Sequence, residues 1–218
     1  MATLDQRVSA PRAMVAELRE RARSQPLTAR AAAWDYLREL GARDDHAALT
    51  EVFAAGDTPE GPDGKLEGLI VGKLFGIPEA RLANPLMRID PTWRGKTFDL
   101  AGGVGWNRLS PLARYVMPVI TAGYLRLRSA GSEVEGFDFS HALDASWIAP
   151  HKTVRALDYS VPEYHNPSVR TFPIARTRDE LVEVIPQVYL GRALLRTHGG
   201  DIRPIAYFAL REPIGSPL

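Results

Sequence analysis

The pattern of apolar and polar positions predicts three short amphipathic helices in the segment 1–56. Apolar residues recur there at intervals of three and four, and charged residues fill the opposite faces. We expect the first helix to begin at Pro11, the second to be capped by Thr28, and the third to be capped by Asp44 or Asp45. Apolar stripes of this kind need a partner surface, so the helices are expected to pack on the rest of the chain.

The pattern changes after the segment GDTPEGPDG, from Gly56 to Gly64, which is dense in turn-forming residues and indicates a junction. Short apolar runs separated by Gly, Pro, Asn and His then follow, as expected for strands. A broken helix is expected in IPEARLANPLMRID and a further helix in PLARYVM, while THGGD is expected to join the last two strands as a hairpin. The predicted strands are KLEGLIVGKLF, TWRGKTFDL, GVGWNRL, VEGFDFSHA, TVRALDYS, DELVEVI, QVYLGRALLR and IRPIAYFALR.

These elements predict an α+β protein. The helical segment 1–56 is expected to pack on an antiparallel β-barrel domain, 64–212, of about seven to nine strands. The faces of the strands mix apolar and polar residues, which fits a sheet covered by helices on one side and closed around a lined cavity on the other. The same pattern fits a plain two-layer core. An NTF2-like cone, with helices before one open curved sheet, is the alternative architecture.

Composition removes several classes of function. The 218-residue chain has a formal net charge of +1, which argues against a general nucleic-acid surface. It has no cysteine, so disulfides, thiolate nucleophiles and cysteine metal sites are excluded. We find no secretory signal and no apolar run long enough for a transmembrane helix. We therefore expect a cytoplasmic protein without a membrane partner; a homodimer is left open, and the Ala- and Arg-rich helices suggest a bacterial genome.

The segment TWRGKTFDLAGGVGWNRL, from Thr92 to Leu109, combines large rings, glycines and charges. Glycine lets a ring lie against the backbone, and a lysine stem can cover an indole face. One interpretation is a pocket wall of aromatic surface, with Lys96, Asn107 or Arg108 as a polar anchor. The other is a stack of Trp93 on a basic side chain that closes the barrel.

The candidate acid–base residues lie further along the chain. Asp158 shares a strand face with Val154 and Ala156, so its carboxyl could point inward among apolar groups and have a raised pKa. In FDFSHALD, Asp138 and His141 flank a serine, but no nucleophile-elbow motif accompanies them, which disfavours a hydrolase triad. The histidine spacing matches no metal motif, so no metal site is expected.

The stretch TWRGKTFD resembles the W-x-G-K-x-F signature of small bacterial proteins of the GXWXG-type family, whose function is not established. The resemblance continues through Asp158–Tyr159, Arg178–Leu181, Tyr189–Gly191 and Tyr207–Leu210, in the order found in such proteins. The segment KLEGLIVGKL departs from the family because it has no clear G-x-W-x-G. The resemblance implies a lipocalin-like barrel over about residues 64–212.

We expect this barrel to bind a small hydrophobic molecule in its interior, without a cofactor. The alternative is a cofactor-independent cyclase, isomerase or dehydratase that acts on a polyketide- or terpene-like substrate in the same cavity. The candidate catalytic residues are Asp158, Asp138, Tyr159 and His141. The candidate ligand-binding residues are Trp106, Asn107, Arg108, Tyr124, Trp147, Tyr189 and Tyr207.

Overall fold

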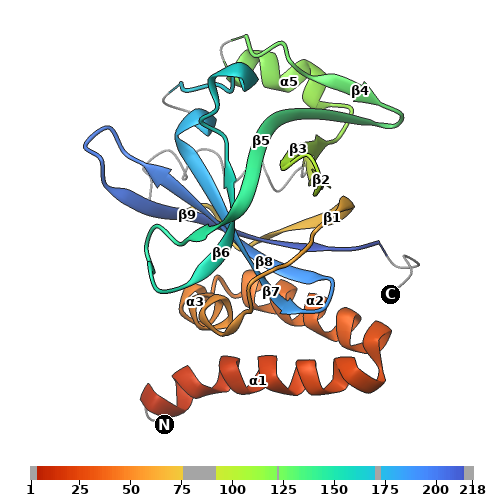
Figure 1. Cartoon of the computed structure of the whole chain (residues 1–218), viewed down its shortest axis with the longest axis vertical. Helices are drawn as coiled ribbons and strands as arrows, with labels where there is room; N and C mark the ends of the chain where they lie inside the picture. Colours follow the sequence, from red (N-terminus) through yellow and green to blue (C-terminus); the bar gives the residue numbers. More distant parts are fainter. Residues whose placement is uncertain (1–3, 76–91, 122, 170–172, 214–218) are drawn as a thin grey trace.

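A computed structural model describes residues 4–75, 92–121, 123–169 and 173–213, with the side chains of residues 4–9 left out. The helices of the N-terminal segment are α1 (Leu4–Ser24), α2 (Pro26–Ala42) and α3 (His46–Ala55). They lie together on one side of the molecule (Figure 1). Along the described part of the chain, no helix is long and apolar enough to cross a membrane.

Nine strands form one antiparallel sheet within the described residues, in the order β3-β2-β1-β9-β8-β7-β6-β5-β4. Because β3 also pairs with β5, from Val104 opposite Ser140 to Leu109 opposite Val134, the first eight strands of that order close into a barrel. The short β4 pairs with β5 alone. The strands are β1 (Gly64–Val71), β2 (Trp93–Asp99), β3 (Val104–Leu109), β4 (Arg128–Ala130), β5 (Glu133–Ala145), β6 (Thr153–Asp158), β7 (Thr177–Ile185), β8 (Val188–Arg196) and β9 (Ile202–Arg211).

Two apolar cores lie on opposite sides of the barrel wall. The outer core joins the three helices to the outward-facing residues of β6 to β9, including Val154, Val182, Leu190 and Ala209. The inner core lies inside the barrel. Its members are Leu66, Phe98, Leu109, Ala113, Met117, Tyr124, Val134, Phe137, Phe139, Leu157, Tyr159, Leu181, Tyr189, Phe208 and Leu210.

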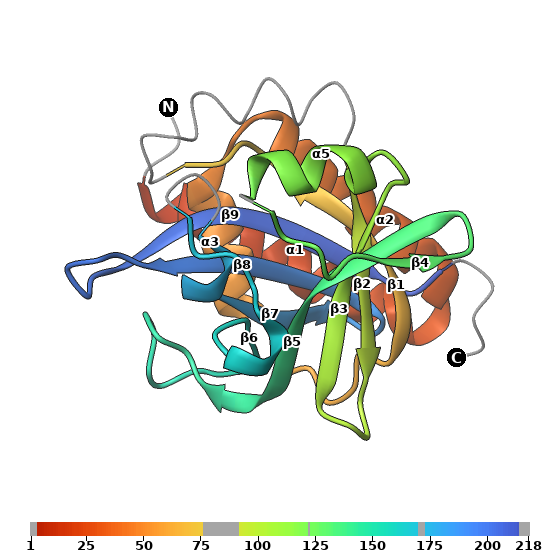
Figure 2. The same ribbon diagram turned by 90° about the horizontal axis from the view of Figure 1, so that it is seen from above.

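Helix α5 (Ala113–Ile120) lies at the end of the barrel opposite α1 (Figures 1 and 2). Its buried residues, Ala113 and Met117, belong to the inner core together with Leu109 and Phe137. The helix therefore covers this end of the barrel.

A polar group on the outer wall holds the β5–β6 connection against the sheet. Glu180, which is fully buried, accepts hydrogen bonds from Arg192 at 2.8 Å, the Ser146 hydroxyl at 2.9 Å and the Trp147 backbone N–H at 2.6 Å. The Trp147 ring lies between two guanidinium groups of β7 and β8. These contacts satisfy the buried carboxylate and fix the connection in place.

The structure confirms the predicted α+β architecture, the helical N-terminal segment and the hairpin between β8 and β9. Asp45 caps α3 by accepting from the backbone N–H of Ala48 at 3.0 Å. The start expected for the first helix was wrong, because α1 begins at Leu4 and contains Pro11. The broken helix expected in IPEARLANPLMRID lies outside the described residues.

Candidate functional site

The W-x-G-K segment of β2 places Lys96 inside the barrel, with 2% of its surface exposed. Gly95 has φ +137° and lies so close to β1 that an added Cβ would be 2.1 Å from the Leu66 carbonyl oxygen. Only glycine fits this position. The pairing of β2 with β3 shifts register between Trp93 and Gly95, and this irregularity sets which residues of β2 face inward.

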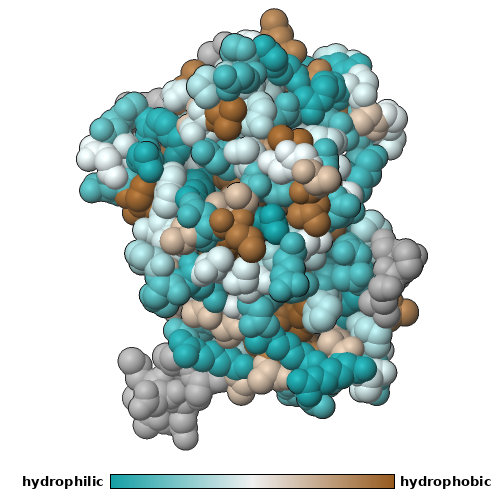
Figure 3. Space-filling model, in the orientation of Figure 1, coloured by the Kyte–Doolittle hydropathy of each residue, from teal (hydrophilic) through white to brown (hydrophobic). Residues whose placement is uncertain are grey.

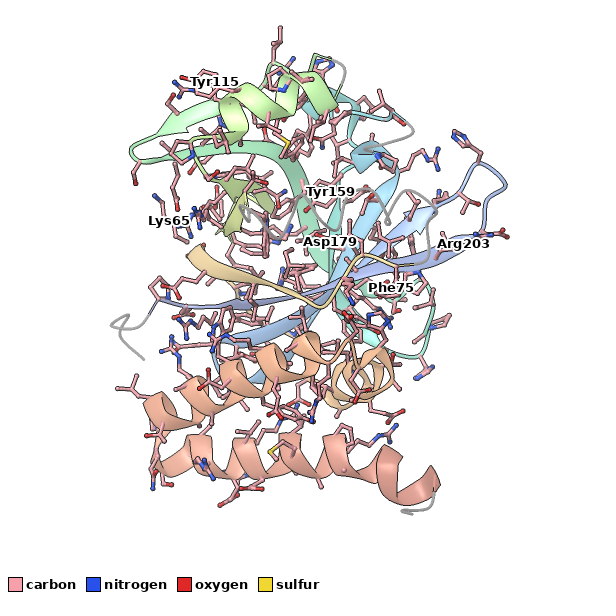
Figure 4. The ribbon with its side chains drawn as sticks, turned by 180° about the vertical axis from the view of Figure 1, so that it is seen from behind. Lys65, Phe75, Tyr115, Tyr159, Asp179 and Arg203 are labelled. Atoms are coloured by element: carbon pink, nitrogen blue, oxygen red, sulfur yellow. The ribbon has the colours of Figure 1, made fainter. Side chains whose placement is uncertain are left out.

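Lys96 joins Asn107, Tyr159 and Asp179 in a buried group that we call the polar cluster. The Lys96 ammonium donates to Asn107 Oδ1 at 2.9 Å and to the Tyr159 hydroxyl, and its Nζ lies 2.9 Å from Asp179 Oδ2. Tyr159 donates to Asp179 Oδ2 at 2.9 Å, and Asn107 Nδ2 donates to the Phe137 carbonyl oxygen at 3.0 Å. The cluster thus satisfies its own donors and acceptors across β2, β3, β7 and the end of β6. Figure 4 shows Tyr159 and Asp179 near each other in the barrel.

Aromatic rings surround the ammonium group of the polar cluster. Lys96 Nζ lies 5.1 Å from the ring centres of both Phe139 and Phe208, 5.2 Å from that of Tyr159 and 5.7 Å from that of Trp93. Contacts at this distance are attractive, since the faces of the rings carry negative charge. The site is therefore a small polar centre within an apolar, ring-lined interior.

Glycines of neighbouring strands make room for these rings. A Cβ added to Gly191 would lie 2.2 Å from the Phe208 ring, and one added to Gly105 would lie 2.5 Å from the Phe139 ring. Gly68 is placed in the same way against Trp93, whose indole N–H donates to Asn107 at 2.9 Å. The combination of rings, glycines and charges between Thr92 and Leu109 follows from this packing.

Burial and charge act on the titratable groups of the cluster in different directions. Burial lowers the pKa of the Lys96 ammonium, and the Asp179 carboxylate raises it. The effect of burial is the larger, so the pKa lies below the usual lysine value. Burial and the negative charge of Asp179 raise the pKa of Tyr159 well above its usual value. Tyr159 is therefore a neutral phenol that can donate a hydrogen bond, beside an amine that burial makes easier to deprotonate.

A second polar pair lies inside the barrel, away from the cluster. Arg155 Nη1 lies 3.2 Å from His141 Nδ1, and Arg155 Nη2 donates to the Glu60 carbonyl oxygen at 2.8 Å. The His141 ring packs on Phe98 with 5.2 Å between ring centres. Burial and the positive charge of Arg155 lower the pKa of His141, so its neutral form is favoured.

The predicted catalytic residues divide between the two sides of the wall. Tyr159 belongs to the inner core, and His141 packs on rings of the same core. Asp138 faces outward and forms two hydrogen bonds of 2.8 Å with Arg128.

The inward orientation predicted for Asp158 was wrong. Val154, four positions earlier on the same strand, packs in the outer core, whereas Leu157 and Tyr159 lie in the inner core, so the alternation of β6 turns Asp158 outward. Its carboxylate accepts from the Ser160 backbone N–H at 2.8 Å. The face that carries Val154 is apolar because it meets the helices.

The predicted ligand-binding residues divide in the same way. Asn107, Tyr124 and Tyr189 are buried on the inner side; Tyr124 accepts from the Phe137 backbone N–H at 2.8 Å. Tyr207 instead packs in the outer core, with its hydroxyl 3.0 Å from that of Thr50.

The remaining three candidates lie outside the barrel interior. Arg108 forms two hydrogen bonds of 2.8 Å with Glu133, and Trp106 packs against a guanidinium group of β4. Trp147 lies between the guanidinium groups of Arg178 and Arg196, 4.9 and 4.5 Å from its ring. These residues stabilise the outer wall and are not interior contacts.

Asp179 is the member of the cluster that the sequence did not single out. Asp179 and Glu180 are adjacent on β7 and therefore face opposite sides of the wall: Asp179 meets Lys96 inside, and Glu180 meets Arg192 outside. Asp179 could have been found because it lies two positions before the apolar Leu181 and therefore on the same face of the strand. Leu181 is fully buried in the inner core. Within the described ranges, no group of three or more His, Cys, Asp or Glu side chains is arranged to hold a metal ion.

The fold and site define an α+β protein whose N-terminal helices pack on a closed antiparallel barrel with a buried polar cluster. Comparison with models of known protein families, with curated proteins and with solved structures found no match. The resemblance to GXWXG-type proteins therefore stays a prediction.

Proposed function

We propose that the barrel interior binds a small, mainly apolar molecule that carries one polar group, and that Lys96 and Asn107 hold this group. The supporting observation is the polar cluster itself. It places an ammonium and a carboxylate among aromatic rings, at positions where apolar side chains would be expected in an ordinary core. Taking each charge out of water costs several kcal/mol, and well-packed apolar residues often replace a buried ion pair without loss of stability. A role in binding explains why the cluster is present.

The neighbouring groups indicate what the ligand would look like. The rings around Lys96 offer flat apolar surface, which suits an aromatic or unsaturated hydrocarbon frame. The Lys96 ammonium and the Asn107 amide are donors, so they suit a carboxylate, sulfonate or carbonyl oxygen. Such an oxygen would replace an internal acceptor of the cluster.

Two fluorescent probes of nearly the same shape test this proposal. N-phenyl-1-naphthylamine is neutral, and 8-anilinonaphthalene-1-sulfonate adds an anionic group to the same ring system. We expect saturable binding of both, and Lys96→Met is expected to weaken sulfonate binding about tenfold, or about 1.4 kcal/mol, while binding of the neutral probe changes little.

Lys65→Met is the matched control, because Lys65 is exposed on the adjacent strand β1 and projects from the barrel (Figure 4). Circular dichroism establishes that each variant is folded, and Tyr159→Phe serves as a second cluster variant if Lys96→Met does not fold. Failure of both probes to saturate wild-type protein, or equal effects of Lys65→Met and Lys96→Met, contradicts the proposal.

A cofactor-independent cyclase, isomerase or dehydratase is the second candidate function. The observation that favours it is the Tyr159 phenol, held between the Lys96 ammonium and the Asp179 carboxylate. Tyr159 could deliver its proton to an oxygen of the substrate while Lys96 stabilises the phenolate, and Asp179 could accept a proton from a neighbouring carbon or oxygen.

The two functions are separated by one comparison. If an apolar-compound screen yields a molecule that the protein converts, Tyr159→Phe is expected to abolish turnover and keep binding of the neutral probe. Asp158→Asn is the control, since Asp158 faces outward. Turnover by Tyr159→Phe at the wild-type rate excludes the acid–base role.

A further inference from the structure

Helix α5 and the segment after it expose an unusual set of apolar side chains. The exposed fractions are 73% for Tyr115, 80% for Val119 and 82% for Leu125, with Leu112 at 47% and Ile120 at 39%. We call these five residues the α5 patch. Figure 3 shows apolar side chains projecting at this end of the molecule, and Figure 4 labels Tyr115 there.

The helix is apolar on both sides for separate reasons. Ala113 and Met117, four positions apart, face the barrel and belong to the inner core. Leu112, Tyr115 and Val119 follow the spacing of an adjacent stripe of the same helix and are exposed. Covering the barrel end accounts for the first stripe and leaves the second without an internal function.

The segment that carries the patch contains basic residues and no acidic ones. From Ser110 to Arg128 the sequence contains three arginines, Arg114, Arg126 and Arg128, and no aspartate or glutamate. Arg114 and Arg126 are exposed, and Arg128 is paired with Asp138. Two exposed cations therefore lie beside the apolar patch within a segment that has no acidic residue.

We propose that the α5 patch docks on the surface of an anionic lipid bilayer. Apolar and aromatic side chains that protrude from a helix insert at the boundary between headgroups and acyl chains, and neighbouring arginines bind the negatively charged headgroups. A helix that crosses a bilayer needs a long apolar run, whereas a helix that docks on one side of the bilayer does not.

A second copy of the chain fits this surface less well. A symmetric contact through the patch would place Arg114 and Arg126 of both copies in one interface, and like charges repel. A bilayer containing anionic lipid offers an apolar acyl-chain region for the patch and negatively charged headgroups for the arginines.

Vesicle co-sedimentation of the full chain tests the proposal. Vesicles of phosphatidylcholine alone are compared with vesicles of equimolar phosphatidylcholine and phosphatidylglycerol. We expect binding to the anionic vesicles that Tyr115→Ser/Val119→Ser/Leu125→Ser weakens at least tenfold and that Arg126→Gln weakens several-fold. Binding to phosphatidylcholine alone is expected to be much weaker.

The matched control changes three exposed apolar residues elsewhere, Leu27, Leu143 and Ile148, to serine. An equal loss from this control, or no sedimentation of wild-type protein with anionic vesicles, overturns the proposal. Light scattering in the absence of lipid tests whether a second copy of the chain occupies the patch. If the wild-type protein is a dimer, the patch variant is a monomer and neither binds vesicles, the surface serves self-association instead. Binding of N-phenyl-1-naphthylamine by the patch variant in solution reports on the interior separately, so the two proposals can fail independently.

Discussion

Lys96 of β2 and Asp179 of β7 lie on strands that do not pair, and their charged atoms meet at 2.9 Å inside the barrel. Less than a tenth of either side chain is exposed. The pair therefore links two parts of the wall through the interior, with Tyr159 and Asn107 bonded to the same ammonium.

Removing one partner of this pair should destabilise the protein more than removing both. Lys96→Met leaves the Asp179 carboxylate buried without its cation, and we expect a loss of about 3–5 kcal/mol in the free energy of unfolding. Lys96→Met/Asp179→Leu should recover part of that loss. Urea unfolding measures the stability of the single and the double variant. Asp35→Asn, which removes an exposed pair with Arg38, is the control and should change the free energy of unfolding by less than about 0.5 kcal/mol. Additive effects of the two cluster substitutions would refute the coupling.

His141 should make the protein less stable as the solution becomes mildly acidic. Its pKa in the folded state lies below 6.5, because burial and Arg155 disfavour the imidazolium. Between that lowered value and 6.5 the unfolded chain binds more protons than the folded one, so stability falls as pH falls through this window. Urea unfolding should show this fall in wild-type protein and a smaller one in His141→Phe. NMR of the histidine resonances should show that His141 titrates below pH 6.5. A His141 titration above 6.5 contradicts the prediction.

Glu133 should contribute stability that is lost in acid. The hydrogen bonds from Arg108 lower its pKa below 4.5, so the folded state favours the carboxylate. The contribution is present above pH 4.5 and is lost as pH falls through the lowered folded-state value. Glu133→Gln should reduce the free energy of unfolding by about 1 kcal/mol at neutral pH and should reduce the acid sensitivity. Glu20→Gln, at an exposed pair with Arg23, is the control and should change the free energy of unfolding at neutral pH by less than about 0.5 kcal/mol.

Gly191→Ala should show how tightly the interior is packed. The added methyl group would lie 2.2 Å from the Phe208 ring, and we expect a loss of about 1–3 kcal/mol. Gly199→Ala is the control, because its nearest neighbour is 3.8 Å away and its φ is not in the left-handed region. Thermal unfolding of the two variants gives the comparison. Gly191→Ala/Phe208→Leu should regain stability relative to Gly191→Ala, and failure to do so would mean that the ring is not the obstacle.

The architecture could be predicted because periodicity and turn residues carry it. Helix spacing, the break between Gly56 and Gly64, and short strands bounded by turns were enough to give helices followed by an antiparallel barrel. Closure depends on the pairing of β3 with β5, which are separated by α5 and β4. Local patterns do not encode a contact of that range, and a cone therefore remained a possible alternative.

The side on which a strand residue faces was harder to predict, because both sides of this wall are apolar in places. On β6 the outer Val154 and the inner Leu157 are both fully buried, so hydrophobicity alone does not distinguish the two faces. Asp158 and Tyr207 were assigned to the interior for this reason and lie outside it. Of the three residues considered as a polar anchor, Lys96 and Asn107 lie inside the barrel, whereas Arg108 is paired with Glu133 outside it.

The three N-terminal helices pack on the outer face of β7, β8 and β9. Arg19 of α1 donates to the Val184 carbonyl oxygen at 3.0 Å, and Val182, Val184 and Leu190 are fully buried against the helices. A chain shortened to residues 64–212 would expose these apolar side chains to water and would be expected to precipitate. We therefore expect the helical segment and the strands to fold together, and any shortened version for ligand screening should keep both.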